Sequence, residues 1–210
     1  MRVRTLSGAW RDVLVAALLL ALLALIAVPA QANARRPARL TSCLDTELQP
    51  TGADLGRIRT ATLCLVNRER AERSERPLAP SSQLGQAAQR HAESMAFGDY
   101  FAHVGPRGET PLSRIRASGY ISSAQTRYEV GENIGWGSLW LATPSAMVAA
   151  WMASPAHRAN ILDPRFRATA VGVFPELPAS LARGQAGAIY TQDFGASVIA
   201  PVHSTRARRR

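Results

Sequence analysis

The chain has 210 residues, with 25 Lys or Arg against 15 Asp or Glu, a formal net charge of +10, and 47% apolar residues. This length suits one domain with short attached segments, and the apolar fraction is too high for a disordered chain. All of the basic residues are Arg, which excludes lysine-dependent classes such as P-loop NTPases, protein kinases and Schiff-base enzymes. Arginine content by itself is weak evidence for a nucleic-acid partner.

The first 34 residues have the pattern of a secretory signal peptide. Arg2, Arg4 and Arg11 precede an uninterrupted apolar run at residues 13–28, and Ala-x-Ala cleavage patterns follow at residues 30–34. Because the run is shorter than the roughly 20 apolar residues of a spanning helix, a retained membrane anchor is the weaker alternative. We therefore expect a secreted protein, extracellular or held at the cell surface.

The chain has two cysteines, Cys43 and Cys64. In an oxidising compartment an even pair at this spacing most simply forms one disulfide, and a thiol nucleophile or a metal site is the alternative. The bond would tether a polar lead-in at residues 35–52 to the domain that follows.

Helical patterns dominate the first half of this domain. Apolar residues recur at three- and four-residue steps over residues 53–73, with the arginines of this stretch, Arg70 among them, mostly on the other side. A second helical stripe covers residues 81–98 and has His91 on its apolar side. Three hydroxyl–proline pairs, at residues 110–111, 143–144 and 154–155, predict three further helix starts.

Strand patterns follow later in the chain, at residues 128–134, 169–174 and 186–194. Helices that precede strands predict an α+β fold, with a small antiparallel sheet flanked by helices, in a domain over residues 53–197. The basic tail at residues 198–210 is either a solvated end or a contact for anionic cell-surface polymer, lipid or nucleic acid.

No two histidines lie three or four residues apart and no G-x-S-x-G occurs, so any metal or catalytic site must combine distant segments. Six motifs stand in one order along the chain. They are N-R-E-R-A-E-R at 67–73, H-A-E-S-M-A at 91–96, Y-F-A-H-V-G-P at 100–106, G-E-N-I at 131–134, W-M-A-S-P-A-H-R-A-N-I-L at 151–162 and Y-T-Q-D-F-G at 190–195. Together they resemble the bacterial branch of the CAP superfamily, also called the SCP domain, which includes cysteine-rich secretory, antigen 5 and pathogenesis-related proteins.

The resemblance implies an α-β-α sandwich whose cleft is lined by two His and two Glu and holds zinc in some members. His103, Glu132 and His157 match three of these four residues, whereas the stretch after Trp151 has no counterpart of the second Glu. Two imidazoles and one carboxylate are a reasonable Zn²⁺ shell with a position left for water. If Glu132 binds through that water, it is a candidate general base.

We therefore expect a secreted CAP domain whose His/Glu cleft binds a divalent metal, with zinc as the candidate, and an extracellular peptide, glycan or lipid. One alternative is a metal-assisted, peptidase-like hydrolase that uses Glu132. Another is a passive adhesion module that holds anionic cell-surface polymer through its arginines. We expect a monomer with no specific nucleic-acid partner.

Overall fold

The structure is a computed structural model that describes residues 42–121 and 126–199. The predicted signal peptide, the lead-in before residue 42 and the basic tail from residue 200 lie outside the described residues. The described elements all belong to one compact unit, Leu40–Arg210. No helix in the described part of the chain is long and apolar enough to span a bilayer.

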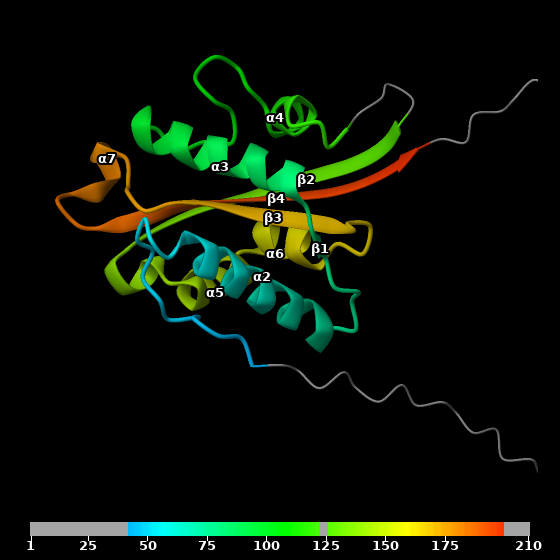
Figure 1. Ribbon diagram of the computed structural model, residues 1–210, viewed down its shortest axis with the longest axis horizontal. Helices are drawn as coiled ribbons and strands as arrows, with labels where there is room; N and C mark the ends of the chain where they lie inside the picture. The colour runs from blue at the N-terminus through cyan, green and yellow to red at the C-terminus, as the bar shows by residue number, and fades with distance from the viewer. Residues whose placement is uncertain (1–41, 122–125, 200–210) are drawn as a thin grey trace, which may run out of the picture. The chain divides into compact units, whose positions relative to one another are not determined.

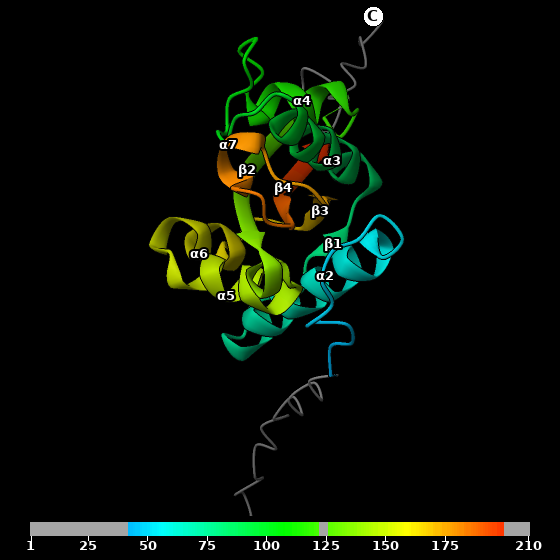
Figure 2. The same ribbon diagram turned by 90° about the vertical axis from the view of Figure 1, so that its left-hand side faces the viewer.

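Two layers of helices enclose one sheet (Figures 1 and 2). One layer consists of α2 (Leu55–Glu72), α5 (Pro144–Ala153) and α6 (Pro155–Leu162). The other consists of α3 (Ser82–Phe97) and α4 (Pro111–Ala117). The arrangement confirms the expected α+β sandwich, because each helix has one apolar face to bury and the sheet offers two.

The sheet has the strand order β1-β3-β4-β2. Its members are β1 (Ala79–Pro80), β2 (Thr126–Ser138), β3 (Ala168–Phe174) and β4 (Gly187–Ile199). β4 is antiparallel to β2 and β3, whereas β1 runs parallel to β3. The sheet is therefore mixed rather than antiparallel, and the sequence missed β1 because two residues ending in Pro80 carry no alternating pattern and Pro is tolerated at a sheet edge.

All three predicted helix starts are confirmed, at α4, α5 and α6. Thr110 and Thr143 accept hydrogen bonds from backbone N–H groups of the first helical turn, whereas Ser154 makes no such side-chain bond. Strands β2 and β4 are longer than the strands predicted from the apolar patterns, because the two strands pair with each other along their whole length. The short helices η1 (Leu139–Ala142) and α7 (Ala179–Ala182) were not predicted, since four residues are too few to show a period.

Separate apolar clusters fill the two interfaces of the sheet. On the side of α2, α5 and α6 the buried residues include Ile58, Val66, Trp151, Tyr190 and Phe194. On the side of α3 and α4 they include Leu84, Ala92, Met95, Ile115 and Ile189.

Gly172 lets α3 lie directly on β3. A Cβ at this position would come within 2.3 Å of the backbone of Ala88, which is closer than any side chain permits. The absence of a side chain therefore sets how near α3 approaches the sheet.

Arg70 is fully buried, which corrects the expectation that it faces solvent. Its guanidinium donates hydrogen bonds to the carbonyls of Arg76, Ile161 and Asp163, and burial lowers its pKa. A cation can remain in the interior here because carbonyl oxygens surround it. Arg70 thus ties the end of α2 to the end of α6, a role that the periodicity of α2 does not indicate.

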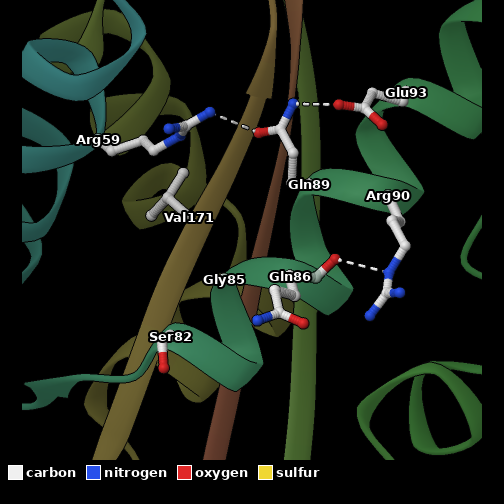
Figure 3. Close-up of a pocket in the computed structure, with 8 residues that line it drawn as sticks. All are labelled: Arg59, Ser82, Gly85, Gln86, Gln89, Arg90, Glu93 and Val171. Carbon is white, nitrogen blue, oxygen red and sulfur yellow. Dashed lines mark hydrogen bonds between the residues drawn. The ribbon is translucent and has the colours of Figure 1, made fainter. Parts of the chain in front are cut away.

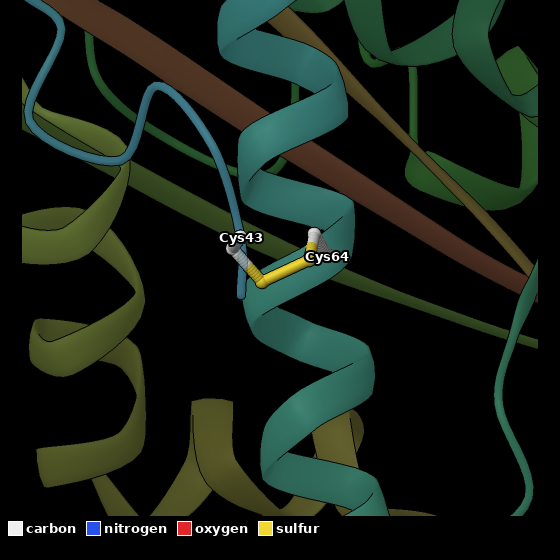
Figure 4. Close-up of a disulfide and its surroundings, with 2 residues drawn as sticks. All are labelled: Cys43 and Cys64. Atoms are coloured by element: carbon white, nitrogen blue, oxygen red, sulfur yellow. A yellow bond between two sulfur atoms is a disulfide. The ribbon is translucent and has the colours of Figure 1, made fainter. Parts of the chain in front are cut away.

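The predicted disulfide joins Cys43, in the extended segment, to Cys64 in α2 (Figure 4). The same segment is held by the Asp45–Arg57 ion pair at 2.5 Å and by a hydrogen bond from Ser145 N–H to the carbonyl of Thr46 at 2.9 Å. The lead-in is therefore packed against the domain from residue 43 onward.

The double substitution Cys43→Ser with Cys64→Ser is expected to lower the free energy of unfolding by about 3 kcal/mol, because it removes a cross-link over a 21-residue separation. Urea unfolding followed by circular dichroism measures this change. Wild-type protein kept in dithiothreitol is the control and should unfold like the double variant. Equal midpoints for oxidised wild type and double variant would contradict the prediction.

Candidate functional site

The carboxylate of Glu132 is the centre of the site. Its side chain lies in the middle of β2 and is only 1% exposed. His103 Nδ1 lies 2.7 Å from Oε1, and Arg114 donates to Oε2 at 2.5 Å. Because a carboxylate only accepts, Nδ1 is the protonated nitrogen of the His103 ring and Nε2 is left as an acceptor.

Arg114 comes from the first turns of α4, which begins after the Thr110–Pro111 pair. Besides Glu132, its guanidinium donates to the carbonyl of His103 at 2.9 Å and to that of Glu109 at 2.6 Å. One side chain therefore neutralises the buried carboxylate and also fixes the loop that carries His103. Charge-assisted bonds of this kind are the strongest side-chain hydrogen bonds in proteins.

A second carboxyl group, Asp193 on β4, lies beside Glu132. The two residues are direct partners in the antiparallel ladder, so their side chains project from the same face. Asp193 is fully buried, and its pKa is raised well above the ordinary value by burial and then by the negative charge of Glu132. No N–H or hydroxyl of the described residues donates to either of its oxygens. The raised pKa favours the neutral, protonated form of Asp193 beside Glu132.

His91, on α3, closes the inner side of the site. Its Nε2 lies 3.0 Å from the carbonyl of Ala102 and 3.9 Å from Oε1 of Glu132. Burial lowers the pKa of His91 to about 4, and the nearby Arg114 acts in the same direction while Glu132 opposes it. His91 is thus a neutral donor to Ala102 that braces the loop before His103.

His157 reaches the site from the opposite face of the sheet. Successive residues of a strand point to opposite faces, so Glu132 meets α3 and α4 whereas Asn133 meets α6. Asn133 donates to the backbone carbonyl of His157 at 3.2 Å, and Asn160 donates to the carbonyl of Glu132 at 3.2 Å. Burial lowers the pKa of His157, and the neighbouring His103 acts in the same direction.

Of the three residues predicted as zinc ligands, the structure therefore joins His103 to Glu132 and gives the His157 ring no hydrogen bond to either. Among residues 42–121 and 126–199, no three His, Cys, Asp or Glu side chains gather in a way that could hold a metal ion. Both oxygens of Glu132 already have partners, and the guanidinium of Arg114 takes the place of a cation. The residues as arranged do not fit a zinc ion, so no step is derived through a metal.

Arg114 and Asp193 were not predicted as site residues, and His91 was predicted only to lie on the apolar side of its helix. A signal for Asp193 existed, because it is a charged residue in the middle of an apolar strand. No local pattern distinguishes Arg114, because arginines are frequent in this chain and several of them lie in predicted helices.

Stability is expected to fall as pH decreases from 6.5 towards 4. The pKa of His91 is about 4 in the folded state, below the ordinary 6.5. Between these two pH values the unfolded chain binds a proton at His91 and the folded chain does not, so protonation favours unfolding. Replacing His91→Gln, which keeps an N–H donor, should reduce the loss of unfolding free energy between pH 7 and about pH 4.5 by roughly 2 kcal/mol. Urea unfolding at both pH values measures it, and an unchanged pH slope would refute the prediction.

The wild-type protein is expected to retain only substoichiometric zinc after dialysis, because Arg114 occupies the carboxylate. Inductively coupled plasma mass spectrometry should find the same low content in wild type, His103→Ala and His157→Ala. One zinc ion per wild-type chain that is absent from both variants would contradict this expectation and support the predicted three-residue metal site.

A family model described as the cysteine-rich secretory protein family, CAP, matches residues 63–192. The uncharacterized protein YkwD of Bacillus subtilis (strain 168) is 33% identical over 130 residues, which cover 62% of this chain and 44% of that protein. This chain thus accounts for less than half of the length of that relative.

Solved structures share the fold. An extracellular protein containing a SCP domain from Bacillus anthracis superposes with a TM-score of 0.53 at 24% identity, over 69% of this chain and 43% of that chain. An outer surface protein from Borrelia burgdorferi gives a TM-score of 0.50 at 17% identity, over 65% of this chain and 90% of that chain. With the family model matched over more than half of the 210 residues, the chain belongs to the cysteine-rich secretory protein (CAP) family.

Proposed function

We propose that the chain is an exported CAP domain that binds a polar extracellular ligand, a glycan or a peptide, at the imidazole of His103. The proposal rests on the different solvent exposure of two side chains that are hydrogen-bonded to each other. The His103 side chain is 49% exposed, whereas its partner Glu132 is 1% exposed. Glu132 holds Nδ1, so Nε2 is the ring nitrogen available to a ligand.

The charges around His103 favour an uncharged ligand with hydrogen-bond donors. Arg114 compensates the charge of Glu132, while burial favours the neutral forms of His91 and Asp193. An imidazole whose Nδ1–H is engaged accepts a hydrogen bond at Nε2 from a hydroxyl or an amide. Sugars and peptides present such groups in abundance.

The surroundings of the site offer both polar and apolar groups to a ligand. A cavity of about 270 Å³ lies beside Arg114, and its lining includes the polar side chains of His91, Ser94, Arg107 and Glu109. These side chains can hydrogen-bond the hydroxyls of a glycan or the amides of a peptide. Exposed Phe101 and Val104 flank His103 in sequence and offer apolar surface to a sugar ring or a peptide side chain.

Two observations support export. The Cys43–Cys64 disulfide requires an oxidising compartment to persist. The structural relatives are described as an extracellular protein and an outer surface protein. Together with the signal-peptide pattern of residues 1–34, they favour secretion to the cell surface or beyond it.

A second candidate function is hydrolysis, with His103 and not Glu132 as the general base. Both oxygens of Glu132 are engaged and its side chain is buried, so it is placed to orient an imidazole. A carboxylate that fixes the tautomer of a half-exposed histidine is a common arrangement in general-base catalysis. In such a reaction Nε2 of His103 would take the proton from an attacking water.

Binding of anionic polymer through arginines is less favoured as the main function. Many arginines of the described chain are already paired with carboxylates, among them Arg57, Arg73, Arg107 and Arg165. Surface arginines in such pairs contribute less free positive charge to a polyanion site.

The experiment titrates the mature protein with soluble cell-wall muropeptides, which carry both sugar and peptide groups, and with casein peptides. Imidazole resonances in two-dimensional NMR report on His103. We expect the Nε2 signal of His103 to shift on binding, and His103→Ala to weaken binding by about tenfold or more through the lost hydrogen bond and contact area.

Matched variants separate a binding role from a structural one. Asp193→Asn keeps a donor to Glu132 and should bind like wild type, whereas Glu132→Gln should weaken binding because the tautomer of His103 is no longer fixed. Release of ninhydrin-positive products from either probe, lost in His103→Ala, would establish hydrolysis instead. Unchanged affinity in His103→Ala would overturn the proposed binding site.

A further inference from the structure

The outer edge of β3 is only partly covered. The two-residue strand β1 pairs with Ala168 and Thr169, and the chain then leaves the sheet at Ser81, which caps α3. Alternation along a strand directs the backbone groups of Thr169, Val171 and Val173 to this edge. Ser81 N–H bonds the carbonyl of Thr169, and neither backbone loops nor side chains of the described residues bond Val171 there.

The side chain of Gln89 occupies the position of the next strand partner. Its amide donates to the carbonyl of Val173 and accepts from the N–H of Val173, both at 3.0 Å. Arg59 donates to the same amide at 2.8 Å, and the amide donates to Glu93 at 2.9 Å. A side chain from α3 thus makes the two hydrogen bonds that a neighbouring strand would make, which is one way to protect a sheet edge.

This edge opens into a hollow between α2 and α3 (Figure 3). The cavity has a volume of about 480 Å³, and Val171 of β3 lines it together with the hydrogen-bonded side chains of Arg59 and Gln89. Arg90 adds a second cation to the wall. The Nε of Arg59 is buried and no acceptor in the described chain receives its hydrogen, which leaves a donor for a carboxylate.

We propose that this edge is a binding site for an extended peptide that carries an acidic side chain. The peptide pairs with β3 as an added strand and hydrogen-bonds the backbone of Val171. When the Gln89 side chain moves off the strand edge, the peptide also hydrogen-bonds the backbone of Val173. Its carboxylate meets Arg59. β-strand addition of this kind takes its affinity from main-chain hydrogen bonds and its specificity from flanking side chains.

The site is independent of the proposed function at His103. The sheet order β1-β3-β4-β2 places the open edge of β3 on the opposite side of the sheet from β2, which carries Glu132. A peptide bound at β3 therefore leaves the His103 imidazole accessible. The two proposals can fail separately.

The test uses a fluorescein-labelled peptide of about six residues, the usual length of a strand, with alternating Thr and Val and one central Asp. Fluorescence anisotropy measures its affinity for the mature protein. Gln89→Ala exposes the backbone of Val173 and should tighten binding by about tenfold. Gln86→Ala, which lines the same cavity without contacting β3, is the matched control and should bind like wild type.

Changes on the peptide require no refolding of the protein. Complete backbone N-methylation should weaken binding by at least about tenfold, because it removes every main-chain donor. Replacing the Asp of the peptide by Asn should lower its affinity for the wild-type protein but leave its affinity for the Arg59→Gln variant unchanged. No detectable binding to Gln89→Ala, or equal binding of the methylated peptide, would overturn the proposal. A dimer of the free protein that the peptide does not dissociate would assign the edge to a second copy and would also overturn it.

Discussion

A buried carboxylate that cannot reach water must be neutralised by its neighbours, and this constraint organises the site of the CAP domain. Glu132 meets it with three groups from three different elements: Arg114 of α4, the ring of His103 in the preceding loop, and Asp193 of β4. Arg114 supplies the compensating charge, and removing it would leave an unpaired carboxylate in the interior, so the loop, the helix and the ladder meet at one residue. The imidazole of His103 is the most exposed part of this network, with 49% of its side chain exposed against 11% for Arg114.

In this arrangement both oxygens of Glu132 are engaged by neighbouring side chains. A guanidinium already satisfies the carboxylate, and the third expected ligand, His157, approaches from the other face through α6. The same network makes His103 a well-oriented acceptor. The opposite edge of the sheet uses a related device, because Gln89 satisfies the backbone of Val173 with a side chain where a strand is missing. On both sides of the sheet, buried polar groups thus have hydrogen-bond partners and a neighbouring polar side chain stays accessible.

Much of the fold could be predicted because its signals are local. The hydroxyl–proline pairs at Thr110, Thr143 and Ser154 mark helix starts, and the apolar spacing of α2 and α3 marks the buried faces. Glu132 and His103 were found through motifs. Arg70, Arg114 and Asp193 were not recognised, since a buried charge is tolerable only where distant carbonyls or carboxyl groups meet it, and no local pattern reports on those partners.

The sequence by itself determined the family, the cysteine pair and the candidate site residues His103, Glu132 and His157. These features depend on residue type and on short-range spacing. Only the tertiary structure decided which of those residues act together. Register between β2 and β4 pairs Glu132 with Asp193, and strand alternation sends Glu132 and Asn133 to opposite faces, so that His103 joins the carboxylate while His157 is held by its backbone. A shift of one residue in that ladder would reverse every one of these contacts.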